Sequence, residues 1–316
     1  MYLNTNKKHR WAVVLAGGDG VRLQALTRRI SGDSRPKQFC PLFGGKTLLT
    51  QTRERLAPLF EEEQTIFVLN RAHDTFYREQ LAGVGDRRKV VQPLNRGTAV
   101  AMALCLELIA QRDDDALVAF FPSDHHFLSC SAFRSTVDYG LGMMEEYPQS
   151  VLILGAEAQY PEVEYGWIEP GRTLVDSPVH PLQRVTRFWE KPTLQRARIL
   201  QQNGCVWNTF VTTGMAGAFK ELFCATTPQL TRSLQSSLST GRLGDFYDKT
   251  APVDFSQAVL SRVPERLAVL RDAKSGWMDL GSPHRVIEAL TLSGMQAPWL
   301  SNGNGTHGAP QLSVVA

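Results

Sequence analysis

The chain has 316 residues, of which 43% are hydrophobic and 21% charged, enough apolar sequence for one large core or two smaller ones. Its net charge of +3 is too small to favour nucleic acid as the main partner. Its five cysteines form no C-x-x-C pair, which disfavours a secreted disulfide scaffold, and no apolar run approaches the roughly 20 residues of a membrane helix. Residues 1–10 are polar and lack the core of a signal peptide, so we expect a cytoplasmic protein with no membrane association.

Short apolar runs alternate with amphipathic segments through the first half of the chain. This alternation is typical of a mostly parallel sheet covered by helices on both faces, with ligands at the carboxyl ends of the strands. The expected strands are Trp11–Ala16, Thr65–Leu69, Lys89–Val91, Ala116–Phe121 and Val151–Leu154. The expected helices are Thr47–Leu59, Ala72–Leu81, Thr98–Gln111 and Ser131–Glu146.

The second half is less regular but shows no linker, so we expect it to continue the same body. The expected strands are Tyr165–Glu169, Arg184–Glu190, Val206–Thr212 and Arg266–Leu270, and the expected helices are Thr193–Gln202, Gly217–Thr226, Gln229–Ser239 and Pro283–Leu292. We predict a flexible N-terminus over 1–10, one domain over 11–295 and a disordered tail over 296–316.

Three glycines follow the first expected strand. Gly17, Gly18 and Gly20 allow the backbone to turn tightly and to bring its N–H groups close to a phosphate chain, and Arg22 adds a guanidinium that can grip phosphate oxygens. A plain tight turn is an equally good interpretation of the glycines taken alone.

Two better-known phosphate-binding patterns do not fit this segment. The dinucleotide pattern G-x-G-x-x-G lacks its third glycine, because Leu23 occupies that position, and a nicotinamide-dependent oxidoreductase is therefore disfavoured. The P-loop pattern ends acceptably at Gly45–Thr47, but Cys40 stands where its first glycine belongs. Thr47 is better interpreted as the N-cap of the next helix.

A lysine behind a proline is the more unusual element of this region. Pro36 fixes the backbone just before Lys37, which favours one direction for the ammonium group. Alone, Lys37 would be interpreted as a solvated surface charge. Together with the glycine segment, it becomes a candidate second cation for a triphosphate.

Taken in order, these segments resemble the motifs of the sugar-1-phosphate nucleotidyltransferases, and most closely those of the mannose-1-phosphate guanylyltransferase branch without a fused isomerase. The resemblance covers about residues 11–292. The matching blocks are Leu15–Leu23, Pro36–Phe39, Arg96–Ala103, Pro122–His125, Tyr165–Ile168, Phe188–Pro192, Trp207–Asn208, Pro252–Phe255 and Trp277–Ser282. The resemblance implies a Rossmann-like, mixed but mostly parallel sheet with helices on both faces, of the nucleotide-diphospho-sugar transferase type.

The implied reaction joins a nucleoside triphosphate to a sugar 1-phosphate and releases pyrophosphate. Because an anion then attacks a polyanion, the protein must hold both partners in line and neutralise charge. The catalytic residues implied by the resemblance are Arg22, Lys37, Asp124, Lys191 and Asp279. The implied nucleotide-binding residues are Leu15, Ala16, Gly17, Gly18, Gly20, Gln92, Pro93, Gly97 and Thr98. The implied sugar-binding residues are Gly166, Glu190, Lys191 and Asn208.

The resemblance also implies Mg²⁺, held by Asp124 and Asp279 together with phosphate oxygens, which form the hard oxygen shell that this cation prefers. Asp124 follows an expected strand, and taken alone it would be interpreted as a helix N-cap or a turn residue. The neighbouring His125 and His126 raise the possibility of zinc, but no third nitrogen or sulfur ligand stands at a useful spacing.

Some positions depart from the family pattern. Gly97 stands where the family usually has asparagine, and after Asn208 the chain reads Thr-Phe-Val-Thr-Thr-Gly-Met, longer than the usual serine-glycine-methionine. The substrates expected are GTP and a hexose 1-phosphate, with mannose 1-phosphate first. Uridylyl, thymidylyl or cytidylyl transfer and a catalytically silent regulatory subunit remain as alternatives, and a homo-oligomer is possible.

Overall fold

A computed structural model describes residues 7–272, 274–297 and 299, and strands from both halves of the chain form one nine-stranded sheet in it. The strand order is β3-β2-β1-β4-β9-β6-β10-β8-β7. The bounds are β1 Arg10–Leu15, β2 Thr65–Asn70, β3 Lys89–Gln92, β4 Leu117–Pro122, β6 Val151–Glu157, β7 Gly166–Val175, β8 Leu182–Glu190, β9 Val206–Met215 and β10 Leu267–Asp272.

The sheet is mixed but mostly parallel, as predicted. The pairs β1–β2, β1–β4, β2–β3 and β6–β10 are parallel, whereas β8 and β9 run against the neighbouring strands of that set. Strand β9 comes late in the chain yet lies between β4 and β6, so the second half does continue the same body. The apolar strands β1 and β4 are buried on both faces, which is why they read as unbroken hydrophobic runs.

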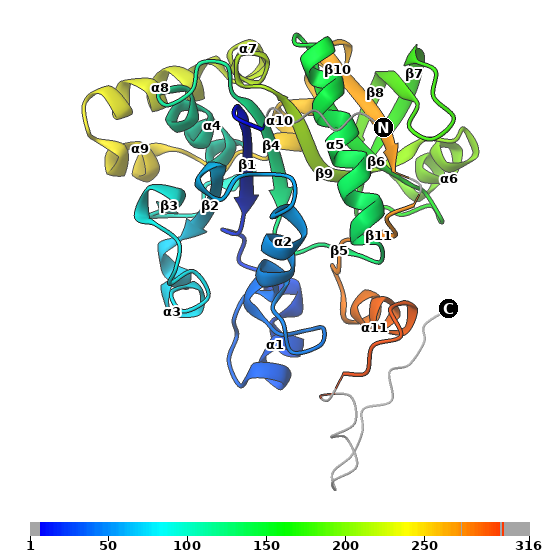
Figure 1. Cartoon of the computed structure of the whole chain (residues 1–316), viewed down its shortest axis with the longest axis horizontal. Coiled ribbons are helices and arrows are strands. Elements are labelled where there is room, and N and C mark those ends of the chain that lie inside the picture. The colour runs from blue at the N-terminus through cyan, green and yellow to red at the C-terminus, as the bar shows by residue number, and fades with distance from the viewer. Residues whose placement is uncertain (1–6, 273, 298, 300–316) are drawn as a thin grey trace, which may run out of the picture.

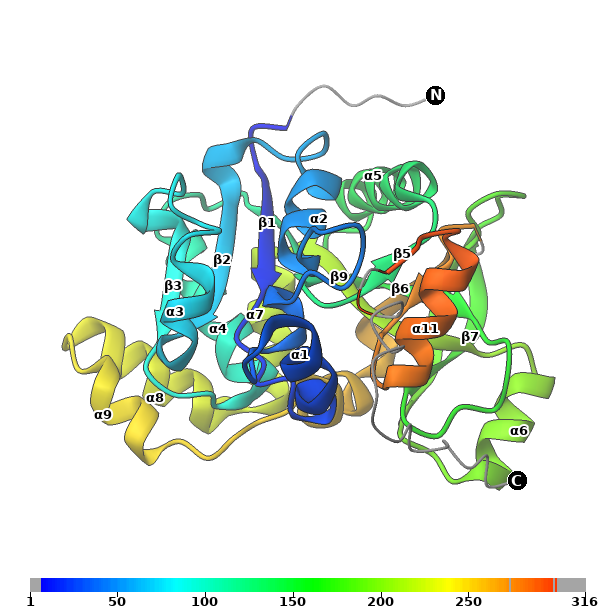
Figure 2. The same ribbon diagram turned by 90° about the horizontal axis from the view of Figure 1, so that it is seen from below.

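Helices cover both faces of the sheet (Figures 1 and 2). One face packs against α4 Gly97–Ala110, α7 Ala216–Thr226, α8 Pro228–Ser239, α9 Leu243–Lys249 and α10 Phe255–Ala258. The opposite face packs against α2 Leu48–Leu56, α3 Asp74–Tyr77, α5 Cys130–Glu146 and α6 Leu194–Gln202. A smaller third cluster joins α1 Gln24–Ser31 to α11 Pro283–Leu292.

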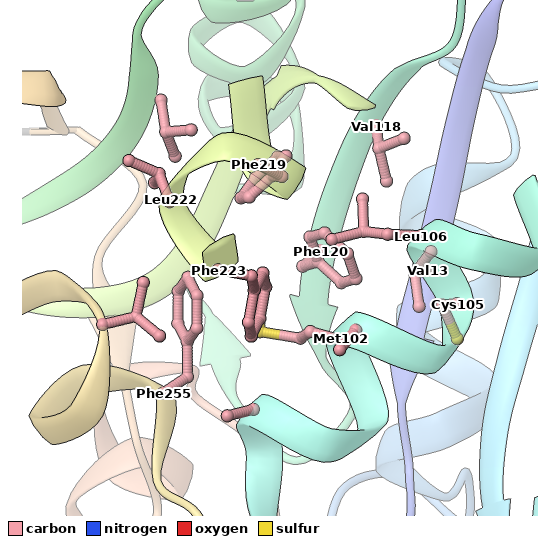
Figure 3. Packing of buried hydrophobic residues seen from close by; sticks show 14 of the residues in the cluster. Val13, Met102, Cys105, Leu106, Val118, Phe120, Phe219, Leu222, Phe223 and Phe255 are labelled. Atoms are coloured by element: carbon pink, nitrogen blue, oxygen red, sulfur yellow. The ribbon is translucent and has the colours of Figure 1, made fainter. Parts of the chain in front are cut away.

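Aromatic side chains fill the core under α4 and α7 (Figure 3). Phe120 of β4 meets Phe219 of α7 edge to face, with ring centroids 5.2 Å apart, and Phe223 packs on Phe255 at 5.6 Å. Full burial of one such side chain stabilises the fold by about 1.5–3 kcal/mol. This packing fixes the position of α10 and of the loop before it, which borders the site described below.

The structure corrects several expected helices. The helix expected over Ala72–Leu81 is confined to α3, with a 3-10 turn over Arg71–His73 before it and turns after it. Helix α1 was not expected at all. It ends at Gly32, whose φ of 79° places it in the left-handed region that favours glycine. The helices α9 and α10 were also not predicted.

The ends of the ordered body differ slightly from the predicted boundaries. Arg10, assigned to the flexible segment 1–10, begins β1, is buried, and donates to Asp138 at 2.6 Å. Ala297, assigned to the tail over 296–316, packs in the cluster formed by α1 and α11. The remainder of these predictions, on 1–6, 298 and 300–316, lies outside the described residues. Among the described helices, none has the length and apolar character to span a membrane.

Candidate active site

A cavity of about 570 Å³ opens at the carboxyl ends of the parallel strands. Leu15, Gln92 and Pro122, the last residues of β1, β3 and β4, all line it. This is where a sheet of this kind binds ligands, because the loops that follow its parallel strands meet at that edge.

Most of the predicted nucleotide-binding residues line this cavity. Those that do are Leu15, Gly17, Gly18, Gln92, Gly97 and Thr98. Ala16 is buried behind it, and Gly20 lines an adjacent cavity of about 280 Å³. Pro93 is not among the lining residues. The structure thus gathers this group at one place, while nucleotide binding itself stays a prediction.

The glycine loop is held in shape by the segment that carries the lysine. Gln38 donates through Nε2 to the carbonyl oxygens of Ala16 and Gly18, at 3.1 and 2.7 Å. Gly20 has a φ of 60°, and a Cβ there would lie 3.0 Å from the backbone nitrogen of Lys37. The left-handed φ and this tight contact both favour glycine, so the glycine motif and the lysine motif form one packed unit.

Lys37 is buried and joins two segments that are far apart in the sequence. Its Nζ lies 3.2 Å from Oδ2 of Asp124 and donates to the carbonyl oxygens of Asp279 and Leu280, at 2.6 and 3.2 Å. An ammonium group has three donors, and all three are used here. Lys37 is therefore not the solvated surface charge that it would be if interpreted alone.

A short two-stranded ribbon brings Asp279 to Asp124. Strand β5 His126–Phe127 pairs antiparallel with β11 Trp277–Met278. Asp124 lies shortly before β5, and Asp279 directly follows β11. Both aspartates line the main cavity. The expected convergence of the two carboxylates on one pocket is found, whereas their role as metal ligands stays a prediction.

Asp279 is compensated by protein groups. Its Oδ1 accepts hydrogen bonds from the Tyr165 hydroxyl at 2.7 Å, the Gly281 N–H at 3.0 Å and Arg285 Nη1 at 3.0 Å. Burial raises the pKa of Asp279, but Tyr165 and Arg285 outweigh it and hold the pKa below its usual value. Arg285 also pairs with Glu162. We refer to Lys37, Asp124, Asp279 and Arg285 as the charged cluster.

Asp124 is more accessible than Asp279, because a third of its side chain is exposed. Burial raises its pKa, but the Lys37 ammonium and His125 outweigh that effect and lower the pKa below its usual value. Asp124 is therefore ionised at neutral pH. His125 faces it with Nε2 at 3.8 Å, while Nδ1 of His125 accepts a hydrogen bond from the Trp277 indole at 3.0 Å.

Whether these residues suit a divalent cation depends on their free oxygens. No group of three or more histidine, cysteine or acidic side chains in the described parts of the chain is arranged to hold a metal. Asp124 suits a hard cation well. Asp279 suits it through Oδ2, which accepts a hydrogen bond from Arg285 at 3.1 Å, whereas Oδ1 accepts three. The pair therefore fits Mg²⁺ if phosphate oxygens complete the shell.

The two histidines lie in different surroundings. His126 stacks on Phe43, with ring centroids 4.4 Å apart, and its Nε2 lies 3.0 Å from the Ser293 hydroxyl. Burial lowers the pKa of His126 to about 4, so it is a neutral core side chain at physiological pH. Of the two, only His125 lines the cavity.

Arg22 lies at the edge of the site rather than within the main cavity. It lines the smaller cavity together with Lys37, Asp124 and Gly281. Its side chain is 63% exposed and pairs with Glu164 at 3.7 Å. It is thus a cation with freedom to move toward a ligand, next to the charged cluster.

Gly166, Glu190 and Asn208 line the cavity on the side of β7, β8 and β9. A Cβ on Gly166 would lie 3.1 Å from Oε2 of Glu190 and 3.3 Å from Cβ of Asn208, so the three residues are close together. Burial and the charge of Asp254 raise the pKa of Glu190 to about 7. The structure does not bring Lys191 to the cavity wall, and its side chain is exposed.

Gly97 shows why the asparagine usual at its position is absent. Its φ is 83°, and a Cβ there would lie 2.4 Å from the carbonyl oxygen of Val253. That carbonyl accepts from the Ala99 N–H at 3.0 Å, and the Val253 N–H donates to the Arg96 carbonyl at 2.9 Å. The loop before α10 is therefore locked onto the first turn of α4, at a distance that only glycine permits.

Several lining residues were not assigned to the site from the sequence. They are Asn95, Glu164, Tyr165, Phe210, Asp254, Ser256, Gln257 and Trp277. Tyr165, Asp254 and Trp277 belong to the matching motif blocks, so the blocks themselves carried a signal. Arg285 lies outside every block, so no signal in the sequence indicated its place beside the site.

The sequence pattern of the family described as nucleotidyl transferase matches residues 11–293. A mannose-1-phosphate guanylyltransferase of Klebsiella pneumoniae is 28% identical over 283 residues, covering 85% of this chain and 58% of that protein. The xanthan biosynthesis protein XanB of Xanthomonas campestris pv. campestris is 30% identical over 307 residues, covering 94% of this chain and 61% of that protein. The chain thus spans about three fifths of the length of these relatives.

A solved structure from Thermus thermophilus, described as a mannose-1-phosphate geranyltransferase, superposes with a TM-score of 0.74. It is 31% identical in sequence, and the match covers 86% of this chain and 76% of that one.

Proposed function

We propose that this chain, which belongs to the nucleotidyl transferase family, transfers a nucleotidyl group from a nucleoside triphosphate to a sugar 1-phosphate. The substrates we propose are GTP and mannose 1-phosphate, because the similar Klebsiella protein is a mannose-1-phosphate guanylyltransferase. The observation that carries the proposal is that Lys37, which lines the smaller cavity, joins Asp124 to the backbone of Asp279, and both aspartates line the main cavity at the sheet edge.

The chemistry needs no protein nucleophile. A phosphate oxygen of the sugar 1-phosphate forms a bond to the α-phosphorus of the triphosphate, while the bond from that phosphorus to the oxygen bridging to the β-phosphorus breaks. Pyrophosphate leaves with the electron pair, and no proton has to move because the attacking oxygen is already anionic. The task of the protein is to hold the partners in line and to offset the charge that concentrates on the leaving group.

In this proposal the glycine loop and the first turn of α4 bind the triphosphate and its base, which is supported by the cavity that Gly17, Gly18, Gln92 and Thr98 line together. Arg22 supplies the mobile cation for the leaving pyrophosphate. Lys37 fixes Asp124 and adds positive charge next to it.

On the side of β7, β8 and β9, we assign Glu190 and Asn208 to the sugar hydroxyls and Gly166 to the space beside the ring, supported by their common place on the cavity wall. Lys191, which follows Glu190, is proposed for the sugar phosphate. Asp124 and Oδ2 of Asp279 would hold Mg²⁺ with phosphate oxygens. When bound, the cation would offset negative charge on the α-phosphate and the leaving pyrophosphate.

The test is a panel of four nucleoside triphosphates against mannose, glucose and galactose 1-phosphates, with pyrophosphate release measured in the presence of MgCl2. We expect the highest kcat/KM for GTP with mannose 1-phosphate, and loss of release in Asp124→Asn. A preference for UTP, dTTP or CTP would keep the reaction class but overturn the guanylyl assignment. Binding without pyrophosphate release, for every pair, would overturn the proposed enzyme in favour of a regulatory subunit.

A further inference from the structure

Strand β9 contains an irregularity beside Asn208. Its register with β6 passes from Thr212 opposite Ile153 to Asn208 opposite Gly155, so the three residues Thr209–Val211 face the single residue Leu154. This is a bulge of two extra residues. At its centre Phe210 has a φ of 63°, in the left-handed region that glycine adopts freely and that phenylalanine adopts only with strain.

This conformation changes how the sequence departure after Asn208 is interpreted. In the sequence alone, the segment reads as longer than the usual serine-glycine-methionine. The positive φ of Phe210 shows that phenylalanine stands in a backbone conformation that glycine adopts freely. The feature to explain is therefore an aromatic ring on a strained residue beside Asn208.

The bulge is firmly held, and the ring lies at the cavity. The Phe210 N–H donates to Oδ1 of Asn208 at 2.9 Å, and the Thr209 hydroxyl donates to the carbonyl of Leu154 at 2.8 Å. Phe210 lines the cavity and meets Phe255 edge to face, with ring centroids 6.0 Å apart. The ring therefore shares the cavity wall with Glu190 and Asn208.

Packing against the core under α4 and α7 accounts for an apolar side chain at this position, but not for the strained backbone that carries it. Phe210 is only partly buried, and glycine would relieve the strain in the bulge. Strained residues persist where surrounding structure holds them in place, and they cluster at ligand sites. An apolar ring beside polar groups that converge on one point is the usual composition of a small-molecule site.

We propose that Phe210 is a selectivity residue for the sugar, packing its ring against an apolar C–H face of the hexose held by Glu190 and Asn208. This rests on the proposed function. The ring occupies space that a glycine would leave open, so it also excludes sugars that carry a polar substituent on that face. Selectivity of this kind combines an attractive contact with a steric exclusion.

The test measures binding of mannose 1-phosphate and glucose 1-phosphate by calorimetry to the wild type and to Phe210→Gly, Phe210→Asn and Phe210→Tyr. Gly and Asn both tolerate the left-handed conformation, so they remove the ring without adding strain. We expect each to bind the favoured sugar phosphate roughly 3- to 10-fold more weakly, the value of one aromatic contact, and to discriminate less between the two sugars. Phe210→Tyr keeps the ring and should retain both properties.

Thermal unfolding and GTP binding serve as controls. Because glycine relieves the backbone strain but loses the packing of the ring on the core, Phe210→Gly should unfold close to the wild-type temperature, and GTP should bind all four proteins equally. Equal sugar-phosphate binding and unchanged discrimination in the Gly and Asn variants would overturn the role of Phe210 and leave the proposed function intact. If the wild type binds no sugar phosphate at all, the proposed function fails and the inference fails with it.

Discussion

The charged cluster, whose two aspartates line the main cavity, and the opposite wall, formed by Glu190, Asn208 and Phe210, are built in different ways. In the cluster, each charge has a partner within the chain, since Lys37 pairs with Asp124 and Arg285 with Asp279. On the other wall, the carboxyl group of Glu190 has no hydrogen-bond or ion-pair partner among the described residues, and Phe210 is conformationally strained.

This difference indicates at which end of the cavity the charged and polar groups already have partners before a ligand binds. A charge-balanced cluster in a partly buried site holds its geometry without substrate, as preorganised electrostatic stabilisation requires. An unpaired carboxyl group and a strained residue cost free energy that a ligand can recover by forming the missing contacts. We infer that the phosphate end is preorganised and that the other wall is completed by its ligand.

Substitution of Lys37 and of Arg22 tests that preorganisation most severely. Lys37→Ala and Arg22→Ala should each lower kcat by about 10²–10³-fold, because each removes a cation from the developing charge. Only Lys37→Ala should also lower the free energy of unfolding, by about 1–3 kcal/mol, since it leaves buried acceptors unpaired. Pyrophosphate release and urea denaturation measure the two effects. An equal loss of stability in both variants would contradict the proposed division between a fixed and a mobile cation.

Arg285→Ala separates charge balance from metal binding. Asp279 and Arg285 are 11% and 13% exposed, and loss of one partner of such a buried pair costs about 3–5 kcal/mol. Because the freed Asp279 carboxylate is then a better ligand, MgCl2 should raise the unfolding temperature of the variant more than that of the wild type. Arg285→Lys, which keeps the charge, should lie between them. The same MgCl2 response in all three proteins would exclude Asp279 from the metal site.

The sequence predicted the sheet and most of the nucleotide-side residues that line the cavity, because buried strands and ordered motif blocks are local features. It could not show that Lys37 would be buried, since its partners include backbone carbonyls more than two hundred residues away. Nor could it place β9 between β4 and β6, because strand order depends on packing rather than on local pattern.

Sequence reasoning missed residues whose role depends on the local backbone conformation more than on the type of side chain. Arg285 stands on an ordinary amphipathic helix, and its contact with Asp279 depends on the turn that follows the ribbon of β5 and β11. In the sequence, Phe210 is only part of a segment of unusual length. Its positive φ, which identifies Phe210 as a strained residue, is a property of the three-dimensional structure.

Gly97→Asn tests whether the rigid, preorganised part of the site includes the wall that we propose for the nucleotide. The asparagine Cβ would meet the Val253 carbonyl at 2.4 Å and displace the loop from α4, at a cost of about 1–3 kcal/mol. Gly241→Asn is the matched control, because its φ of 69° is similar and nothing lies within 4 Å of its Cβ position. Thermal unfolding of both variants measures the difference. Equal stability in the two would show that the contact with Val253 does not require glycine.

Glu190→Gln tests the other wall through pH, with the smallest expected effect. Because the pKa of Glu190 is raised from 4.5 to about 7, the folded state favours its protonated form. The stability that this contributes is present at pH 4.5 and below, and it is lost as the pH rises toward 7 and above. The unfolding temperature of the wild type should therefore fall more between about pH 5 and pH 8 than that of Glu190→Gln, which cannot ionise. Glu63→Gln, on an exposed turn, should follow the wild type. Parallel profiles for the wild type and Glu190→Gln would mean that this wall already satisfies its carboxyl group, and the contrast between the two ends of the cavity would then no longer hold.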